Sequence, residues 1–296
     1  GMQRGLWLIN RADPASAAYN VAMALQLTGD LDVAALQLAT TDLVRRHESL
    51  RTTYPMINGE PIQVILPADV VESGLTVQVR EVGTSLEDAI GEVTGEGFDI
   101  TTSPPVRAVL LRVSTTEHIL VFVIHHISAD GASMSPLARD LMTAYAARST
   151  GAEPAWKPLP VQYADFSLWL SERLAVTDTD GTTEEDRQLA YWDERLAGVP
   201  ERLDLPHDHP RPKSPTFRGD AVDLEIPATV VAQLEAVARL HHTTSFMVIH
   251  AAFAVLLNRM SGATDLVIGT PFAGRGEQSL DDVVGMFVNT LALRTR

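Results

Sequence analysis

The chain has 296 residues, 45% of them hydrophobic, which is enough to bury a substantial core in about two domains. Its 23 Lys and Arg against 38 Asp and Glu give a formal net charge of −15, so nucleic acid and anionic membrane surfaces are poor partners. The absence of cysteine excludes disulfides, thiolate metal sites and a cysteine nucleophile. The longest apolar stretches are too short to span a bilayer, and residues 1–7 show no secretion signal, so we expect a soluble, cytoplasmic protein.

The first half of the chain has the pattern of a sheet covered by helices. Hydrophobic spacing predicts strands at 20–27, 76–82, 105–113 and 118–124, and helices at 32–46, 85–93 and 132–148. Residues 51–56 and 61–66 flank Asn58-Gly59, the strongest short-range hairpin signal. The strand at 118–124 is apolar at nearly every position, which predicts a central strand with both faces covered.

The second half begins with connections that are rich in proline and acidic residues. We expect helices at 161–174 and 184–196, an acidic stretch at 177–186 and a segment with five prolines at 200–215. The following pattern predicts strands at 221–226, 265–269 and 287–294, and helices at 228–240 and 244–260. The sequence therefore predicts an N-terminal lobe at 1–175, a connecting helix and linker at 176–218, and the beginning of a second lobe at 219–296.

Two adjacent histidines stand where the central strand should end. His125 and His126 precede Asp130 and Gly131, which lie at the expected start of a helix. An imidazole titrates near neutrality, so it can hydrogen-bond an incoming amine or hydroxyl, accept its proton, or stabilise the resulting cation. Asp130 could cap the helix or pair with an arginine, and Gly131 allows close backbone approach or a positive φ. The alternative is that the two histidines have only a structural role at the end of the strand. A metal site is disfavoured because no third histidine lies nearby.

Six segments of the chain match the motifs of one known family, in the family's order. HHISADG at 125–131 matches the motif HHxxxDG. The other five are QRGLW at 3–7, RHESLRTTY at 46–54, YADFSLWL at 163–170, IGTPFAGR at 268–275 and VGMFVNTL at 284–291. One such segment alone is a weak signal, whereas six in register across nearly the whole chain are specific. Together they resemble the condensation domain of nonribosomal peptide synthetases.

The resemblance implies an α/β fold of the α+β sandwich type. It consists of a chloramphenicol-acetyltransferase-like N-terminal lobe and a second lobe of the same type, with a tunnel between them. Because the family continues beyond the FVNTL segment, we expect the second lobe to be C-terminally truncated and the isolated chain to be poorly active.

The resemblance also implies an acyltransferase that forms peptide bonds. The amine of an acceptor aminoacyl group attacks the thioester of a donor acyl or peptidyl group. An upstream donor and a downstream acceptor peptidyl carrier protein hold these groups on phosphopantetheine arms, beside a neighbouring adenylation domain. No cofactor and no metal of the domain's own are implied.

The resemblance assigns roles to individual residues. His126 matches the histidine that contacts the reacting amine, as a base or as a positioner. Gly131 matches the glycine whose backbone lies at the reacting carbonyl. His125 and Asp130 are implied to be structural, as is Arg275, which would pair with Asp130 across the lobes.

The sequence allows two roles for each of two arginines, and it also allows three competing functions. Arg46 and Arg51 are either a solvated helix end or supports of the N-terminal lobe or tunnel wall. His125 and Asp130 also fit the H-x4-D signature of glycerolipid acyltransferases, although basic flanks and membrane attachment are lacking. A free-standing carrier-dependent acyltransferase that makes an ester or amide with a soluble acceptor is a second competing function. The third is a non-catalytic module that docks carrier proteins.

Overall fold

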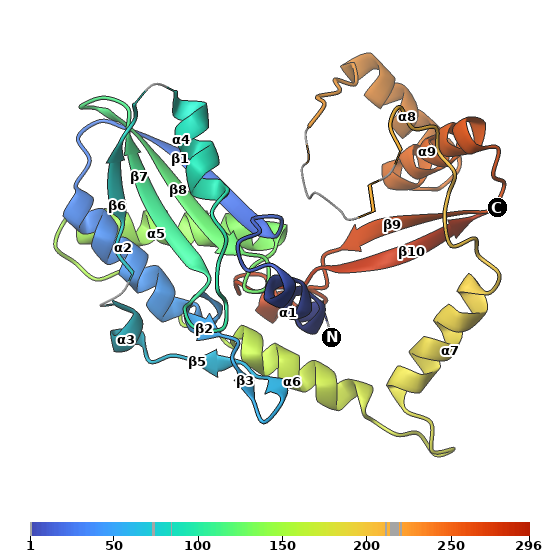
Figure 1. Cartoon of the computed structure of the whole chain (residues 1–296), viewed down its shortest axis with the longest axis horizontal. Coiled ribbons are helices and arrows are strands. Elements are labelled where there is room, and N and C mark those ends of the chain that lie inside the picture. The colour runs from blue at the N-terminus through green and yellow to red at the C-terminus, as the bar shows by residue number, and fades with distance from the viewer. Residues whose placement is uncertain (1, 73–74, 84, 211, 214–218, 220) are drawn as a thin grey trace. The chain divides into compact units, whose positions relative to one another are not determined.

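The computed structural model describes residues 2–72, 75–83, 85–210, 212–213, 219 and 221–296 (Figure 1). They form two compact units. Unit 1 contains the chain up to Leu174 together with Ala273–Asn289, and unit 2 contains Ala175–Phe272 and Thr290–Arg296. The sequence grouped 273–289 with the second lobe; the structure instead places this segment in unit 1, because long-range contacts that no local pattern reveals hold it there.

A four-stranded sheet forms the centre of unit 1. Its strand order is β1 (Asn20–Thr28), β8 (Glu117–His125), β7 (Val106–Arg112) and β6 (Gln78–Glu81). β8 pairs antiparallel with both β1 and β7, and β6 pairs parallel with β7. The interior position predicted for the apolar strand is therefore confirmed.

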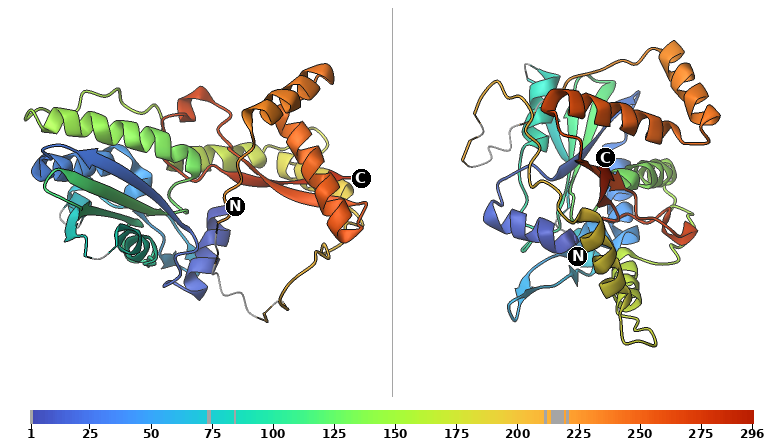
Figure 2. Two further views of the ribbon diagram at one scale, coloured as in Figure 1. Left: turned by 90° about the horizontal axis from the view of Figure 1, so that it is seen from above. Right: turned by 90° about the vertical axis from the view of Figure 1, so that its right-hand side faces the viewer.

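Helices cover both faces of this sheet. Leu120, Phe122 and Ile124 of β8 pack with α2 (Val33–Arg46) and α5 (Met134–Arg148). Val121 and Val123 pack on the other face with Val93 of α4 (Leu86–Thr94) and Trp7 of α1 (Met2–Ala12). Figure 2 shows α5 and α4 on opposite sides of the strands. Two-sided burial explains why β8 carries no polar alternation.

Shorter elements connect these layers. The chain after α2 forms a 3₁₀ turn, η1 (Glu48–Arg51), and two small ladders that pair β2 with β5 and β3 with β4. Asn58 and Gly59 join β3 to β4 with φ values of 54° and 84°, which confirms the predicted hairpin turn. The bounds of these strands and of the remaining elements of unit 1 are β2 Thr52–Thr53, β3 Met56–Ile57, β4 Glu60–Pro61, β5 Val64–Ile65, α3 Ala68–Glu72, α6 Tyr163–Leu174 and η3 Gln278–Leu280.

Unit 2 contains three helices and a two-stranded sheet in its described residues. The helices are α7 (Glu184–Leu196), α8 (Ala228–Leu240) and α9 (Ser245–Ser261); the strands are β9 (Leu266–Phe272) and β10 (Asn289–Thr295). Ala254 and Leu257 of α9 pack against Leu266. Part of the predicted proline-rich linker lies outside the described residues.

One predicted strand of unit 2 is wrong. Residues 221–226 are irregular, and Val222 is 96% exposed. Alternating apolar residues predicted a strand, but a strand also requires a neighbouring strand, and none of the described sheets includes residues 221–226.

Among the described residues, no single helix is both long and apolar enough to cross a bilayer. In that part of the chain, one pair of helices, α8 and α9, reaches the required length and composition when taken together, and the chain bends by 106° between them.

Candidate active site

The HHISADG loop joins the interior strand to α5. β8 ends at His125, and a 3₁₀ turn, η2 (Gly131–Ser133), leads into α5. His125 is buried, and its Nδ1 accepts a hydrogen bond from the Ile127 N–H at 3.1 Å. Burial, followed by repulsion from His126, lowers the pKa of His125 from 6.5 to about 4. The His125 ring is therefore neutral at physiological pH, and it supports the loop through its hydrogen bond to the Ile127 backbone.

His126 differs from its neighbour because its side chain is partly exposed. Its backbone N–H donates to the Tyr19 carbonyl at 2.7 Å. The ring Nδ1 is buried and has no hydrogen-bond partner among the described residues. Among the described residues, no protein group forms a hydrogen bond with the His126 imidazole.

Asp130 is almost fully buried, and both of its carboxylate oxygens accept hydrogen bonds. Its Oδ1 accepts from the Ser133 N–H at 2.9 Å and lies 2.7 Å from the Ser133 hydroxyl and 3.1 Å from Nη2 of Arg275. Its Oδ2 accepts from the backbone N–H groups of Phe287 and Val288, at 3.0 and 3.2 Å. With both oxygens occupied in this way, Asp130 holds the loop and is not placed to take a proton from a substrate.

Arg275 forms a buried ion pair with Asp130, at 3.1 Å. Both residues belong to unit 1, because Arg275 lies in the segment Ala273–Asn289. The guanidinium is 8% exposed, and its Nη1 donates to the carbonyls of Leu280 and Val283 at 2.6 and 2.7 Å. It also lies over the Phe287 ring, 4.2 Å from the centroid. Arg275 therefore ties its own segment to the loop.

Two glycines make this segment's close packing possible. Gly274 has a φ of 68°, and a Cβ there would collide with the Phe287 carbonyl. A Cβ on Gly285 would collide with the ring of Tyr163, whose hydroxyl donates to the Met286 carbonyl at 2.9 Å. The IGTPFAGR, VGMFVNTL and YADFSLWL segments therefore meet at one place.

Gly131 lies at the exposed start of η2. Its φ is not among the left-handed ones, so the positive φ offered as one reason for glycine is wrong. A Cβ here would meet no atom within 4 Å, so the space in front of the backbone is open. The fold itself does not require glycine at this position.

Arg46 and Arg51 lie elsewhere in unit 1 and are not the solvated helix end that we considered. Arg46 Nε pairs with Asp140 of α5 at 2.7 Å, and its guanidinium stacks over Trp156. The same carboxylate lies 3.0 Å from Nε2 of the buried His47, whose pKa burial lowers. Arg51 bonds Glu48 at 3.1 Å. The Arg46–Asp140 pair connects α2 to α5, whereas the Arg51–Glu48 pair lies within η1.

A second group of residues, which no sequence pattern indicated, also bonds the loop. Nε2 of Gln3 donates to the Ile127 carbonyl at 2.8 Å. The Tyr54 hydroxyl lies 3.0 Å from Oγ of Ser128. The resemblance singled out the segments QRGLW and RHESLRTTY, but no spacing rule indicated which of their side chains reach the loop.

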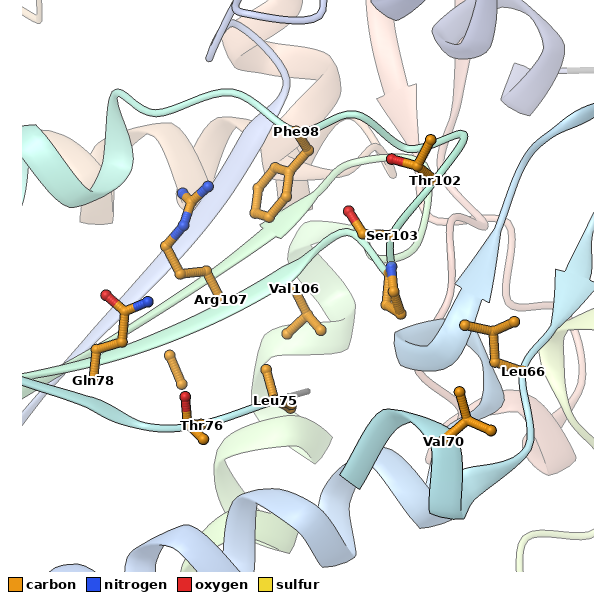
Figure 3. Close-up of a pocket in the computed structure, with 12 residues that line it drawn as sticks. Leu66, Val70, Leu75, Thr76, Gln78, Phe98, Thr102, Ser103, Val106 and Arg107 are labelled. Carbon is orange, nitrogen blue, oxygen red and sulfur yellow. The ribbon is translucent and has the colours of Figure 1, made fainter. Parts of the chain in front are cut away.

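A cavity of about 400 Å³ lies elsewhere in unit 1 (Figure 3). Phe98, Val106 and Arg107 line part of it, and no residue of 125–131 is among the described residues that line it. Arg107 donates to the carbonyls of Val93, Glu96 and Gly97 at 3.1 to 3.2 Å, so its charge is already engaged. No group of three or more His, Asp or Glu in the described parts of the chain could hold a metal ion.

Comparisons with known proteins identify the family. A family model described as "Condensation domain" matches residues 1–296. The chain is 45% identical to isonitrile lipopeptide synthase of Mycobacterium tuberculosis and 42% identical to a dimodular nonribosomal peptide synthase of Bacillus subtilis. Each match covers 99% of this chain but only 12% of the relative, so the chain spans about an eighth of their length.

Solved structures agree with this assignment. The X-domain from teicoplanin biosynthesis superposes with a TM-score of 0.86 at 33% identity, over 99% of this chain and 64% of that one. The X-domain has also been solved in a complex with OxyB, with a TM-score of 0.84 at 33% identity, over the same shares of the two chains. The chain therefore belongs to the condensation-domain family of nonribosomal peptide synthetases and has its chloramphenicol-acetyltransferase-like α/β fold.

Proposed function

We propose that this chain catalyses peptide-bond formation between two carrier-bound groups. The observation that carries the proposal is the contrast within the HHISADG loop. His125, Ser128 and Asp130 are all engaged by protein groups, whereas the side chain of His126 is partly exposed and makes no hydrogen bond within the described residues. A loop in which every polar side chain except one imidazole is bonded by protein groups is suited to present that imidazole to a substrate.

The proposed step is the attack of the acceptor's α-amine on the carbonyl carbon of the donor thioester. A C–N bond forms and the C–S bond breaks, so the donor is released from the sulfur of its phosphopantetheine arm. Nε2 of His126 hydrogen-bonds the amine and takes the proton that it loses, while the departing thiolate acquires a proton. An amine is already a good nucleophile towards a thioester, so orientation supplies much of the acceleration.

The partners follow from this reaction. An upstream carrier protein brings the donor, a downstream carrier protein brings the acceptor, and a neighbouring adenylation domain selects an amino acid. The curated relatives are much longer synthases, which supports a place within a multidomain enzyme, and we place that enzyme in the cytoplasm. No cofactor of the chain's own is needed, because both reacting groups arrive on the carriers.

The test is His126→Ala in the intact parent synthetase with both carriers loaded. We expect the single-turnover rate of dipeptidyl-carrier formation, followed by intact-protein mass spectrometry, to fall by about 100-fold, the low end for an acid–base residue. His241→Ala is the matched control, because His241 is an exposed histidine at the end of α8. An unchanged rate in a folded His126→Ala enzyme would refute the catalytic proposal.

A binding module is the second candidate. The similarity to the X-domain, which forms a complex with OxyB, favours it. In that case His126→Ala leaves product formation intact, while deletion of the domain abolishes recruitment of a partner. Replacing the acceptor carrier with soluble amines or alcohols in the same assay would identify a free-standing acyltransferase by its product.

A further inference from the structure

The peptide that follows His126 is held from outside the motif by Tyr54. The Tyr54 hydroxyl lies 3.3 Å from the Ile127 carbonyl oxygen and 3.0 Å from Oγ of Ser128. Gln3 of α1 donates to the same carbonyl at 2.8 Å, and Nε2 of Gln63 donates to Gln3 Oε1 at 2.8 Å. Tyr54 and Gln3 thus bond the two residues immediately after His126.

Tyr54 is itself fixed and uncharged. Its backbone N–H donates to the Ile100 carbonyl at 2.8 Å, and its own carbonyl accepts from Nε1 of Trp7 at 2.7 Å. Burial raises the pKa of its hydroxyl, so the group keeps its proton at physiological pH. It can then donate to the Ile127 carbonyl and accept from Ser128, which satisfies all three polar groups.

This arrangement matters because the imidazole of His126 has no protein hydrogen bond, among the described residues, to orient it. On one side, the His126 N–H bonds the Tyr19 carbonyl at 2.7 Å. On the other side, the Ile127 carbonyl is bonded by Tyr54 and Gln3. The orientation of the imidazole therefore depends on the backbone from His126 to Ile127, which is hydrogen-bonded on both sides of the ring.

We propose that Tyr54 is a positioning residue that orients His126 by holding the Ile127–Ser128 backbone. This inference rests on the proposed function, because it requires His126 to contact the substrate. A misplacement of about 1 Å at a reacting group can cost up to about 100-fold in rate, so loss of one of several bonds to this backbone should cost about 10-fold.

The test is Tyr54→Phe in the intact parent synthetase with both carriers loaded. The variant keeps the ring and removes the hydroxyl. We expect the condensation rate at saturating acceptor carrier to fall by about 10-fold, with the apparent KM for that carrier unchanged. Tyr145→Phe is the matched control, because it removes a tyrosine hydroxyl of unit 1 that bonds the Asp32 N–H at 3.1 Å, and it should leave the rate unchanged.

A double mutant separates positioning from general stability. If Tyr54 acts through His126, then Tyr54→Phe causes no further loss in a His126→Ala enzyme. An equal loss in both backgrounds, or a wild-type rate for folded Tyr54→Phe, overturns the inference. If Tyr54→Phe does not fold, Ser128→Ala takes its place. It removes the Ser128 hydroxyl that bonds Tyr54, and it should lower the rate only when His126 is present.

The same set of variants distinguishes the two proposals. A wild-type rate for His126→Ala overturns the proposed function and this inference together. A low rate for His126→Ala combined with a wild-type rate for Tyr54→Phe overturns the positioning role alone.

Discussion

We expect Asp130→Ala to lose folding stability before it loses chemistry. The substitution leaves three backbone N–H groups and the Ser133 hydroxyl without the carboxylate that they surround. It also leaves the Arg275 guanidinium, 8% exposed, without its only described carboxylate partner. Removing one partner of a buried ion pair costs about 3–5 kcal/mol, against a total stability of about 5–15 kcal/mol for a typical domain.

Urea unfolding of the purified chain, followed by tryptophan fluorescence, measures this loss. Asp130→Asn keeps the side chain's shape and one oxygen but sets an NH₂ group among donors, so its free energy of unfolding should lie between those of Asp130→Ala and the unmodified chain. Asp204→Ala is the control, because it breaks an ion pair with Arg202 in which both side chains are more than two-thirds exposed, and such pairs contribute about 0–1 kcal/mol. An Asp130→Ala chain with an unchanged urea midpoint, combined with an inactive parent enzyme, would refute the structural role.

Two further predictions concern packing and pH. Gly285→Ala places a Cβ against the Tyr163 ring and should cost about 1–3 kcal/mol of unfolding free energy, whereas Gly276→Ala, which meets no atom within 4 Å, should cost little; equal urea midpoints would contradict this. Because burial lowers the pKa of His125 to about 4 in the folded chain, from 6.5 when the ring is exposed to water, the unfolded state binds more protons between these values. The contribution of the neutral His125 ring to the free energy of unfolding is therefore fully present above pH 6.5, and that free energy should fall by up to about 3 kcal/mol on acidification to pH 4. His125→Gln should make the free energy of unfolding depend less on pH, as measured by urea titrations at several pH values.

Local patterns predicted several elements correctly. The apolar run of β8 indicated an interior strand, and the spacing within α7 and α8 matched their observed bounds, Glu184–Leu196 and Ala228–Leu240. α1 was not predicted: its sequence contains Gly5 and carries no acidic residue in its first turn. The irregular 221–226 shows that alternation marks a possible strand but does not supply its partner.

The residues of the site likewise fall into those that a local sequence pattern indicates and those that it does not. The histidines, Asp130 and Gly131 could be singled out from one short stretch, because the chemistry of the loop is local. The contacts that hold the loop come from far along the chain: Arg275 is 145 residues from Asp130, and Gln3 is 124 residues from Ile127. Arg46 could be taken for a solvated helix end because its partner Asp140 is on another helix, 94 residues away.

The path of the chain through the two units limits how this domain can be recombined. The polypeptide leaves unit 1 after Leu174, returns for Ala273–Asn289, and leaves again at Thr290. A chimaera joined at residue 174 would take the segment that contacts Asp130 and Ser133 from a different parent. Exchange of unit 1 between synthetases therefore requires three junctions, or a donor whose returning segment matches the recipient loop.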